Sequence, residues 1–194
     1  MMEQQTQWKE NVILIDADYA DRLVFDISVQ LERMLERPMP KVEISRWCDY
    51  LSLDGGLRPG NNSIQVLFVY SKQKATLQNF IPSSLATEVD AHSFRDNLGE
   101  FSCASFPVEE ELVSIDKLYI QSVETLLTSS QIKRLLLVAD IDAYGNGLKE
   151  VLPKKTDKDI TLFVCNPQTG FHCSQEVITY SLMAALGIKG EELS

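Results

Sequence analysis

Apolar runs alternate along the chain with segments in which apolar residues recur at helical spacing. Residues 11–15 form an apolar run that ends abruptly at Asp16, as a strand buried on both faces of a parallel sheet does. From Asp21 the spacing changes to helical intervals, which continue until Pro38 and Pro40 interrupt them. The chain is therefore predicted to open with a strand, an acidic loop and a helix.

The second half of the chain repeats this order. An apolar run again ends at an aspartate, Asp140, and helical spacing precedes and follows it. The pattern predicts strands at residues 134–139 and 159–164, and helices at residues 116–127, 147–152 and 174–186.

The middle of the chain has a weaker pattern. It predicts strands at residues 41–48, 64–70 and 100–106 and a helix at residues 87–98. The turn-rich residues 54–62 either close a hairpin or belong to a long crossover.

Together these elements indicate an α/β fold, a three-layer α/β/α sandwich with a mainly parallel central sheet. We expect a single domain over residues 1–194, with its core at 11–166 and a C-terminal helix at about 174–186.

Aspartates cluster where the two most apolar strands end. Asp16 and Asp18 follow the first strand, and Asp140 and Asp142 follow the later one. The carboxyl ends of adjacent parallel strands meet at one edge of the sheet, and Asp116 at a helix start could point to the same place. Such carboxylates repel one another unless a cation intervenes, and Mg²⁺ or Mn²⁺ prefers oxygen ligands. Each aspartate taken singly also fits a helix cap or a turn.

Three segments resemble a known family. Val12–Asp18 resembles the opening strand of NYN domains, which belong to the PIN-like ribonuclease superfamily. Leu136–Tyr144 resembles their later strand followed by Ser-Gly-Asp-Ser-Asp-Phe, and Val113–Lys117 resembles their Lys-Gly-Val-Asp segment. The order and rough spacing of the three motifs fit over about residues 11–166.

This resemblance implies a PIN-like, Rossmannoid fold and metal-assisted hydrolysis of RNA. Asp16, Asp116 and Asp140 would be catalytic and would hold Mg²⁺ or Mn²⁺, with Asp142 as a further ligand. Asp18 would be an accessory group.

Further residues beside the acidic motifs are candidates for contacts with RNA. Tyr19 and Tyr144, each next to an acidic motif, are the aromatic residues best placed to stack on bases. Lys149, Lys154 and Lys155 follow the second motif and are candidates for steering a phosphate backbone.

Two other functions share parts of this pattern. A PIN-like sheet can serve as a non-catalytic binding or interaction protein with a degenerate site. Phosphatases of the haloacid-dehalogenase type also begin with a strand and Asp-x-Asp, so Asp16 would be the nucleophile in that alternative.

Composition narrows the choice of partners. With 18 basic and 28 acidic side chains the formal net charge is −10, which counts against a general nucleic-acid coating protein. The polar N-terminus, the short apolar runs and four cysteines without a Cys-x-x-Cys pair predict a cytoplasmic protein with reduced, buried thiols and no membrane segment. A homo-oligomer is compatible with the sequence but is not indicated by it.

Overall fold

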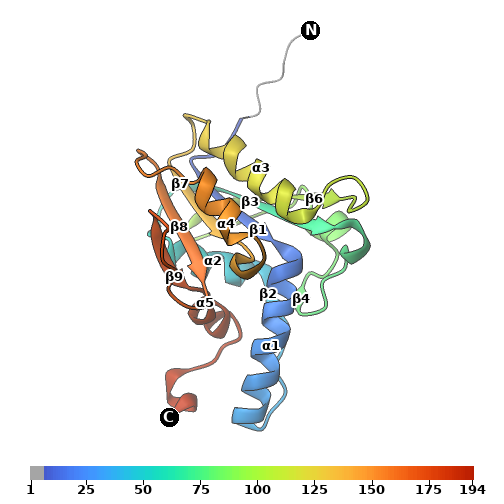
Figure 1. Cartoon of the computed structure of the whole chain (residues 1–194). Coiled ribbons are helices and arrows are strands. Elements are labelled where there is room, and N and C mark those ends of the chain that lie inside the picture. The colour runs from blue at the N-terminus through green and yellow to red at the C-terminus, as the bar shows by residue number, and fades with distance from the viewer. Residues whose placement is uncertain (1–6) are drawn as a thin grey trace.

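The computed structural model describes residues 7–194 and is built on a seven-stranded sheet (Figure 1). The strand order is β5-β6-β3-β1-β7-β8-β9, and every neighbouring pair is parallel except β5 with β6. The strands are β1 (Asn11–Asp16), β3 (Asn62–Ser71), β5 (Ser93–Asp96), β6 (Gly99–Val108), β7 (Arg134–Val138), β8 (Asp159–Val164) and β9 (Ser174–Val177).

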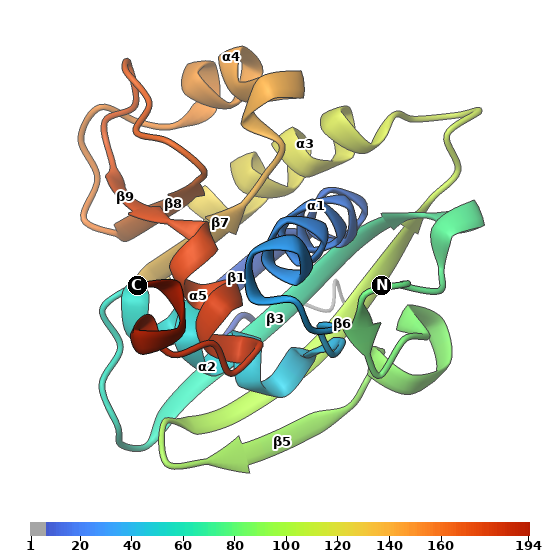
Figure 2. The same cartoon turned by 90° about the horizontal axis from the view of Figure 1, so that it is seen from below.

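Helices cover both faces of this sheet (Figure 2). Along β1 the side chains alternate, so Ile13 and Ile15 pack on one face and Val12 and Leu14 on the other. The first face is covered by α1 (Ala17–Leu35), α2 (Ile44–Asp54) and α5 (Ile178–Ala185), and the second by α3 (Ile115–Leu127) and α4 (Ile141–Val151). The predicted three-layer α/β/α fold with a mainly parallel sheet is confirmed.

The strand order determines where a site can form. Numbered along the chain, the six parallel strands lie in the order 3-2-1-4-5-6 across the sheet, with β1 and β7 adjacent at the centre. The chain proceeds from β1 outward to β6 and then returns to β7, so the order reverses between these two strands. In open α/β sheets, ligands bind in the crevice at the carboxyl ends of the strands on either side of such a reversal.

Two predictions for the middle of the chain were wrong. Only Val42–Glu43 of the predicted strand 41–48 is extended, as β2, which pairs with β4 (Phe80–Ile81). Helix α2 begins at Ile44 because Trp47, Cys48 and Leu51 bury one helical face against the sheet.

The predicted helix at residues 87–98 was also wrong. A single π-helical turn spans Leu85–Val89, and β5 then forms a hairpin with β6. Gly99, with φ of 142°, occupies the end of that hairpin rather than the end of a helix.

Two predicted helices begin elsewhere. α4 begins at Ile141, six residues before the predicted start, because Asp140 caps it. The last helix begins at Ile178 rather than near Ser174, since Ser174–Val177 pairs with β8 as β9. The predicted strands at 64–70, 100–106, 134–139 and 159–164 and the helix at 116–127 are confirmed to within a few residues.

Two further expectations can be compared with the described residues. No helix within residues 7–194 combines the length and the apolar character needed to cross a bilayer. All four cysteines are free, but only Cys48 and Cys103 are buried, while Cys173 is half-buried and Cys165 is exposed. The prediction of buried thiols therefore holds for two of the four.

Candidate functional site

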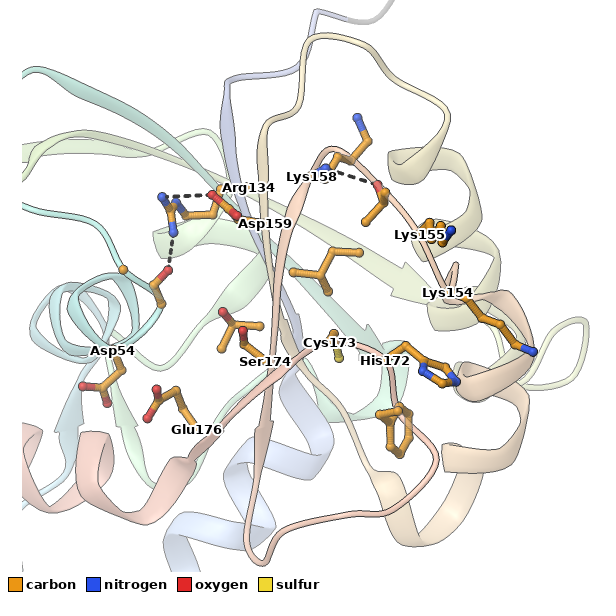
Figure 3. A pocket seen from close by; sticks show the side chains of 16 residues that line it. Asp54, Arg134, Lys154, Lys155, Lys158, Asp159, His172, Cys173, Ser174 and Glu176 are labelled. Carbon is orange, nitrogen blue, oxygen red and sulfur yellow. Dashed lines mark hydrogen bonds and ion pairs between the residues drawn. The ribbon is translucent and has the colours of Figure 1, made fainter.

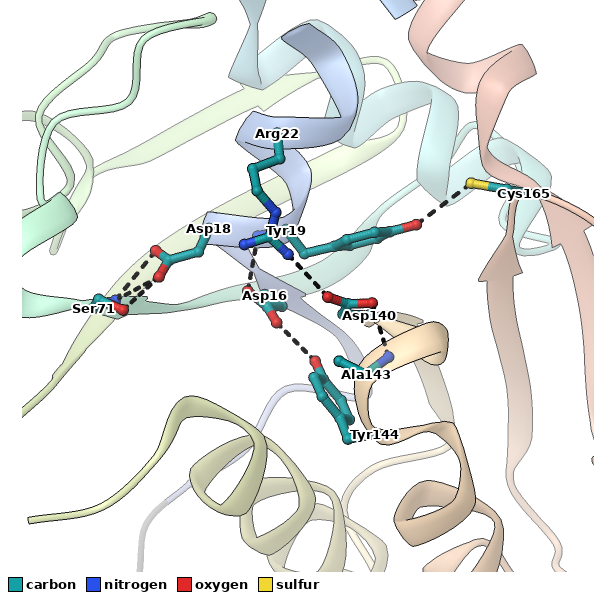
Figure 4. A network of polar contacts seen from close by, with 9 residues as sticks. All are labelled: Asp16, Asp18, Tyr19, Arg22, Ser71, Asp140, Ala143, Tyr144 and Cys165. Atoms are coloured by element: carbon teal, nitrogen blue, oxygen red, sulfur yellow. Dashed lines mark hydrogen bonds and ion pairs between the residues drawn. The ribbon is translucent and has the colours of Figure 1, made fainter. Parts of the chain in front are cut away.

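Asp16 and Asp140 lie side by side in the fold at the reversal of strand order. Asp16 is the last residue of β1, and Asp140 follows β7 by two residues. Each carboxylate caps the helix that follows it (Figure 4). Asp16 Oδ1 accepts a hydrogen bond from the Tyr19 amide at 3.0 Å, and Asp140 Oδ1 accepts one from the Ala143 amide at 3.2 Å.

The second oxygen of Asp16 accepts a hydrogen bond from a tyrosine of α4, on the face of the sheet opposite to α1. Tyr144 donates its hydroxyl to Asp16 Oδ2 at 2.8 Å, and Asp16 is only 2% exposed. A departure from helical backbone at Tyr144, with φ of −139° and ψ of 22°, accompanies this placement within α4. Burial raises the pKa of Asp16 to about 6, although both hydrogen bonds oppose the shift. Burial also raises the pKa of Tyr144, which remains a hydrogen-bond donor.

The second oxygen of Asp140 is paired with an arginine. Arg22 Nη2 lies 2.9 Å from Asp140 Oδ2, and its side chain is 56% exposed while that of Asp140 is 17% exposed. Because Arg22 comes from the second turn of α1, the ion pair joins the first acidic motif to the second. The positive charge beside Asp140 is therefore supplied by the chain itself.

Asp18 points away from Asp16 and Asp140, toward the neighbouring strand β3. Its carboxylate accepts the Ser71 amide at 3.2 Å and contacts the Ser71 hydroxyl. That hydroxyl also lies 2.6 Å from Glu110 Oε1, and one hydroxyl hydrogen serves one acceptor at a time. Asp18 is 7% exposed, so this contact holds the end of β3 against α1.

Asp116 and Asp142 do not join the central pair. Asp116 lies in the first turn of α3, where a hydrogen bond with Ser114 holds its pKa below the usual range. Asp142 is exposed and lines a cavity of about 60 Å³ beside Asp140 and Cys165. Within residues 7–194 no group of three His, Cys, Asp or Glu side chains is arranged to hold a metal ion.

The two aromatic candidates differ in how far they are buried. Tyr144 is buried, 6% exposed, with its ring tilted 5.5 Å from that of Tyr119. The Tyr19 hydroxyl lies 3.5 Å from Cys165 Sγ and closes one side of the small cavity. Tyr144 therefore offers no open ring face to a base, whereas Tyr19 is half-buried and its stacking role stays a prediction.

The three candidate lysines lie in the last turn of α4 or beyond it, away from Asp140, which caps the start of the helix. Lys149 is in the last turn of α4, with Nζ 5.1 Å from the centre of the Phe171 ring. Lys154 and Lys155 line a groove at the start of β8, because α4 carries the chain from the carboxyl end of β7 to the amino end of β8. The structure therefore separates these two lysines from the acidic pair that they were predicted to serve.

Comparison with known proteins assigns a family but no activity. Residues 5–193 match a protein family described as "Family of unknown function (DUF6621)". The chain belongs to the DUF6621 family. No curated protein and no solved structure matches it. The resemblance to NYN domains therefore stays a prediction.

Arg22 and Ser71 are the residues of the DUF6621 site that sequence reasoning did not find. Arg22 lies at the start of the predicted helix, close along the chain to the first acidic motif. Ser71 directly follows the apolar run at residues 64–70, where a strand adjacent to β1 ends. The position of each residue in the sequence could have drawn attention to it. Its contact, Arg22 with Asp140 and Ser71 with Asp18, depends on which strands are neighbours in the sheet.

A second acidic pair gives a testable pH dependence. Asp49 of α2 faces Asp96 of β5. Burial is the main cause that raises the pKa of Asp49 to about 7, and the contact with Asp96 raises it further. Because the folded pKa is raised, the proton stabilises the fold at low pH, and this contribution is lost as pH rises from about 4 to about 7. We expect Asp49→Asn to flatten that part of the stability profile, measured by urea unfolding at about pH 5 and about pH 8. An unchanged slope in the variant would contradict the assignment.

Proposed function

We propose that this DUF6621 chain is a non-catalytic binding protein in which the acidic motifs at the centre of the sheet cap helices and connect neighbouring elements of the fold. One observation carries the proposal: all four carboxylate oxygens of Asp16 and Asp140 are bonded to donors of the chain itself. Two are helix-capping contacts, one is the Tyr144 hydroxyl and one is the Arg22 guanidinium.

These contacts oppose the binding of a divalent ion. Metal ligands must be deprotonated. Each of these oxygens keeps a second lone pair beside its one hydrogen bond, so an ion would have to compete with the charge of Arg22 and with the Tyr144 hydroxyl. The buried position of Asp16 favours its protonated form below about pH 6, and Arg22 already neutralises Asp140. The nuclease predicted from the resemblance would need both contacts to be broken and Asp116 to move toward them.

The phosphatase alternative meets a related obstacle. A nucleophilic aspartate must present an accessible oxygen to the phosphorus atom. Asp16, the candidate nucleophile, is 2% exposed and has hydrogen bonds on both oxygens. Burial of this residue therefore supports a structural role over a covalent one.

The proposal is tested by titrating the full chain with MnCl₂ in a calorimeter at about pH 7.5, with Asp16→Asn and Asp140→Asn alongside. We expect no saturable uptake by any of the three proteins and no Mn²⁺-dependent cleavage of a fluorogenic single-stranded RNA. Micromolar to millimolar binding by the wild type that both substitutions abolish would overturn the proposal in favour of the nuclease. Cleavage that survives in both variants would be traced to a contaminating activity and would leave the expected result in place.

A further inference from the structure

A large groove lies at the edge of the sheet opposite to Asp16 and Asp140. It has a volume of about 870 Å³ and follows the first residues of β7, β8 and β9, and we call it the edge groove (Figure 3). Its walls are the turn after α2, the loop between α4 and β8, and the segment that enters β9. A volume of this size suits a small-molecule ligand, since such pockets usually measure roughly 300–1,000 Å³.

The charges in the edge groove are separated into two ends. Asp54 and Glu176 lie together at one end, and Lys154 and His172 lie at the other, with Lys155 on the adjoining wall (Figure 3). The carboxylates of Asp54 and Glu176 and the ammonium groups of the two lysines form no ion pair within residues 7–194. The charge of Glu176 adds to burial in raising the pKa of Asp54, as expected for neighbouring carboxylates without a cation between them.

The remaining charged groups of the groove hold its walls in place. Arg134 donates a hydrogen bond to the Gly55 carbonyl and pairs with Asp159 at 3.5 Å. Lys158 Nζ donates to the Ser129 carbonyl and, at 2.7 Å, to the Ile132 carbonyl. These tethers fix both rims of the groove before any ligand arrives, which lowers the entropic cost of binding.

Hydroxyl groups lie between the two charged ends. Thr161 of β8 and Ser174 of β9 are partners in the strand register, and both line the groove. A hydroxyl can donate or accept a hydrogen bond, so this part of the groove suits a polar linker rather than an apolar one.

We propose that the edge groove binds a small hydrophilic ligand that carries an amine at one end and a phosphate at the other. The amine is recognised by Asp54 and Glu176, and the phosphate by Lys154, Lys155 and His172. A lysine ammonium binds phosphate as a point charge, and a pair of carboxylates provides acceptors for a protonated amine. This inference rests on the proposed binding function and adds the class of ligand that the protein binds.

The test probes each end separately. Full-length ¹⁵N-labelled protein is titrated with pyrophosphate and, in a second series, with agmatine, while amide shifts are followed by NMR. We expect both to saturate with Kd near or below about 1 mM, with pyrophosphate shifting amides near Thr156 and His172 and agmatine shifting those near Asp54 and Glu176. The two probes should bind together, since their sites lie at opposite ends.

Matched variants decide the assignment. Lys154→Gln/Lys155→Gln should weaken pyrophosphate at least about tenfold and leave agmatine unchanged, and Asp54→Asn/Glu176→Gln should do the reverse. Lys117→Gln/Glu124→Gln on α3 removes the same kinds of charge elsewhere and should change neither. The inference fails if either probe does not saturate, or if the α3 control weakens binding as much as the groove variants. It can fail while the Mn²⁺ titration gives its expected result, so the two proposals are judged separately.

Discussion

Asp16→Asn is expected to stabilise the protein at about pH 8 and to leave it nearly unchanged at about pH 4. Burial of the carboxylate at the end of β1 raises its pKa from the usual 3.8 to about 6. A raised folded pKa means that the protonated side chain favours the fold. This contribution is complete below the unfolded pKa and is lost as pH rises through the folded one. A rise in pKa from 3.8 to about 6 corresponds to about 3 kcal/mol, the largest gain that removal of the charge could give.

The substitution to asparagine is chosen because it conserves the helix cap. An asparagine carbonyl can accept the Tyr19 amide as the aspartate does, and asparagine is among the preferred capping residues. It cannot accept two hydrogen bonds on two charged oxygens, so part of the gain is offset at Tyr144. We therefore expect a net stabilisation of about 1–3 kcal/mol at about pH 8, seen as a rise in Tm of several degrees.

Asp140→Asn is the matched control, because that residue also caps a helix. Asp140 is paired with Arg22, so its substitution removes an ion pair with a largely exposed partner and should lower stability by less than about 1 kcal/mol. If Asp16→Asn raises the stability at about pH 8 and Asp140→Asn lowers it, each carboxylate has its own set of hydrogen-bond donors. Equal stabilisation by both would contradict this and would indicate two charges crowded into one site, as the metal hypothesis requires.

The strands that carry the acidic motifs were predictable because they are buried on both faces. Residues 134–138 have no polar alternation, and only a central strand of a parallel sheet buries both sides of a segment. α2 was mistaken for a strand because Val42, Ile44 and Cys48 fit a period of two over a short window. The helical face became evident only with the sheet beneath it.

The contacts of the site could not be predicted in the same way. Arg22 and Asp140 are separated by 118 positions and Tyr144 and Asp16 by 128, so each contact depends on β1 and β7 being neighbours. The two Asp-x-Asp motifs indicated where carboxylates would lie, but not which hydrogen-bond donors would contact them. The sequence likewise placed Lys154 and Lys155 close to Asp140 along the chain, and the direction of α4 then carried them to the opposite edge.

Gly99→Ala is expected to destabilise the protein by about 3 kcal/mol or more, because the residue is held in two ways. Its φ of 142° disfavours an L side chain, and a Cβ at this position would lie 2.1 Å from the Asn62 carbonyl oxygen. Asn62 and Gly99 are paired in the β3–β6 register, so neither backbone can retreat without loosening that pair of strands. Thermal and urea unfolding measure the loss, and poor recovery of folded protein would be its extreme form.

Gly187→Ala separates the two causes of this loss. Gly187 also has a positive φ, 76°, but a Cβ there would meet no atom within 4 Å. Its substitution should cost only the strain of the left-handed backbone, roughly 1–2 kcal/mol, whereas Gly190→Ala, at an open position without positive φ, should be close to neutral. If Gly99→Ala costs no more than Gly187→Ala, β6 must be able to move away from β3. The assumption that β3 and β6 cannot separate at Asn62 and Gly99 would then be wrong.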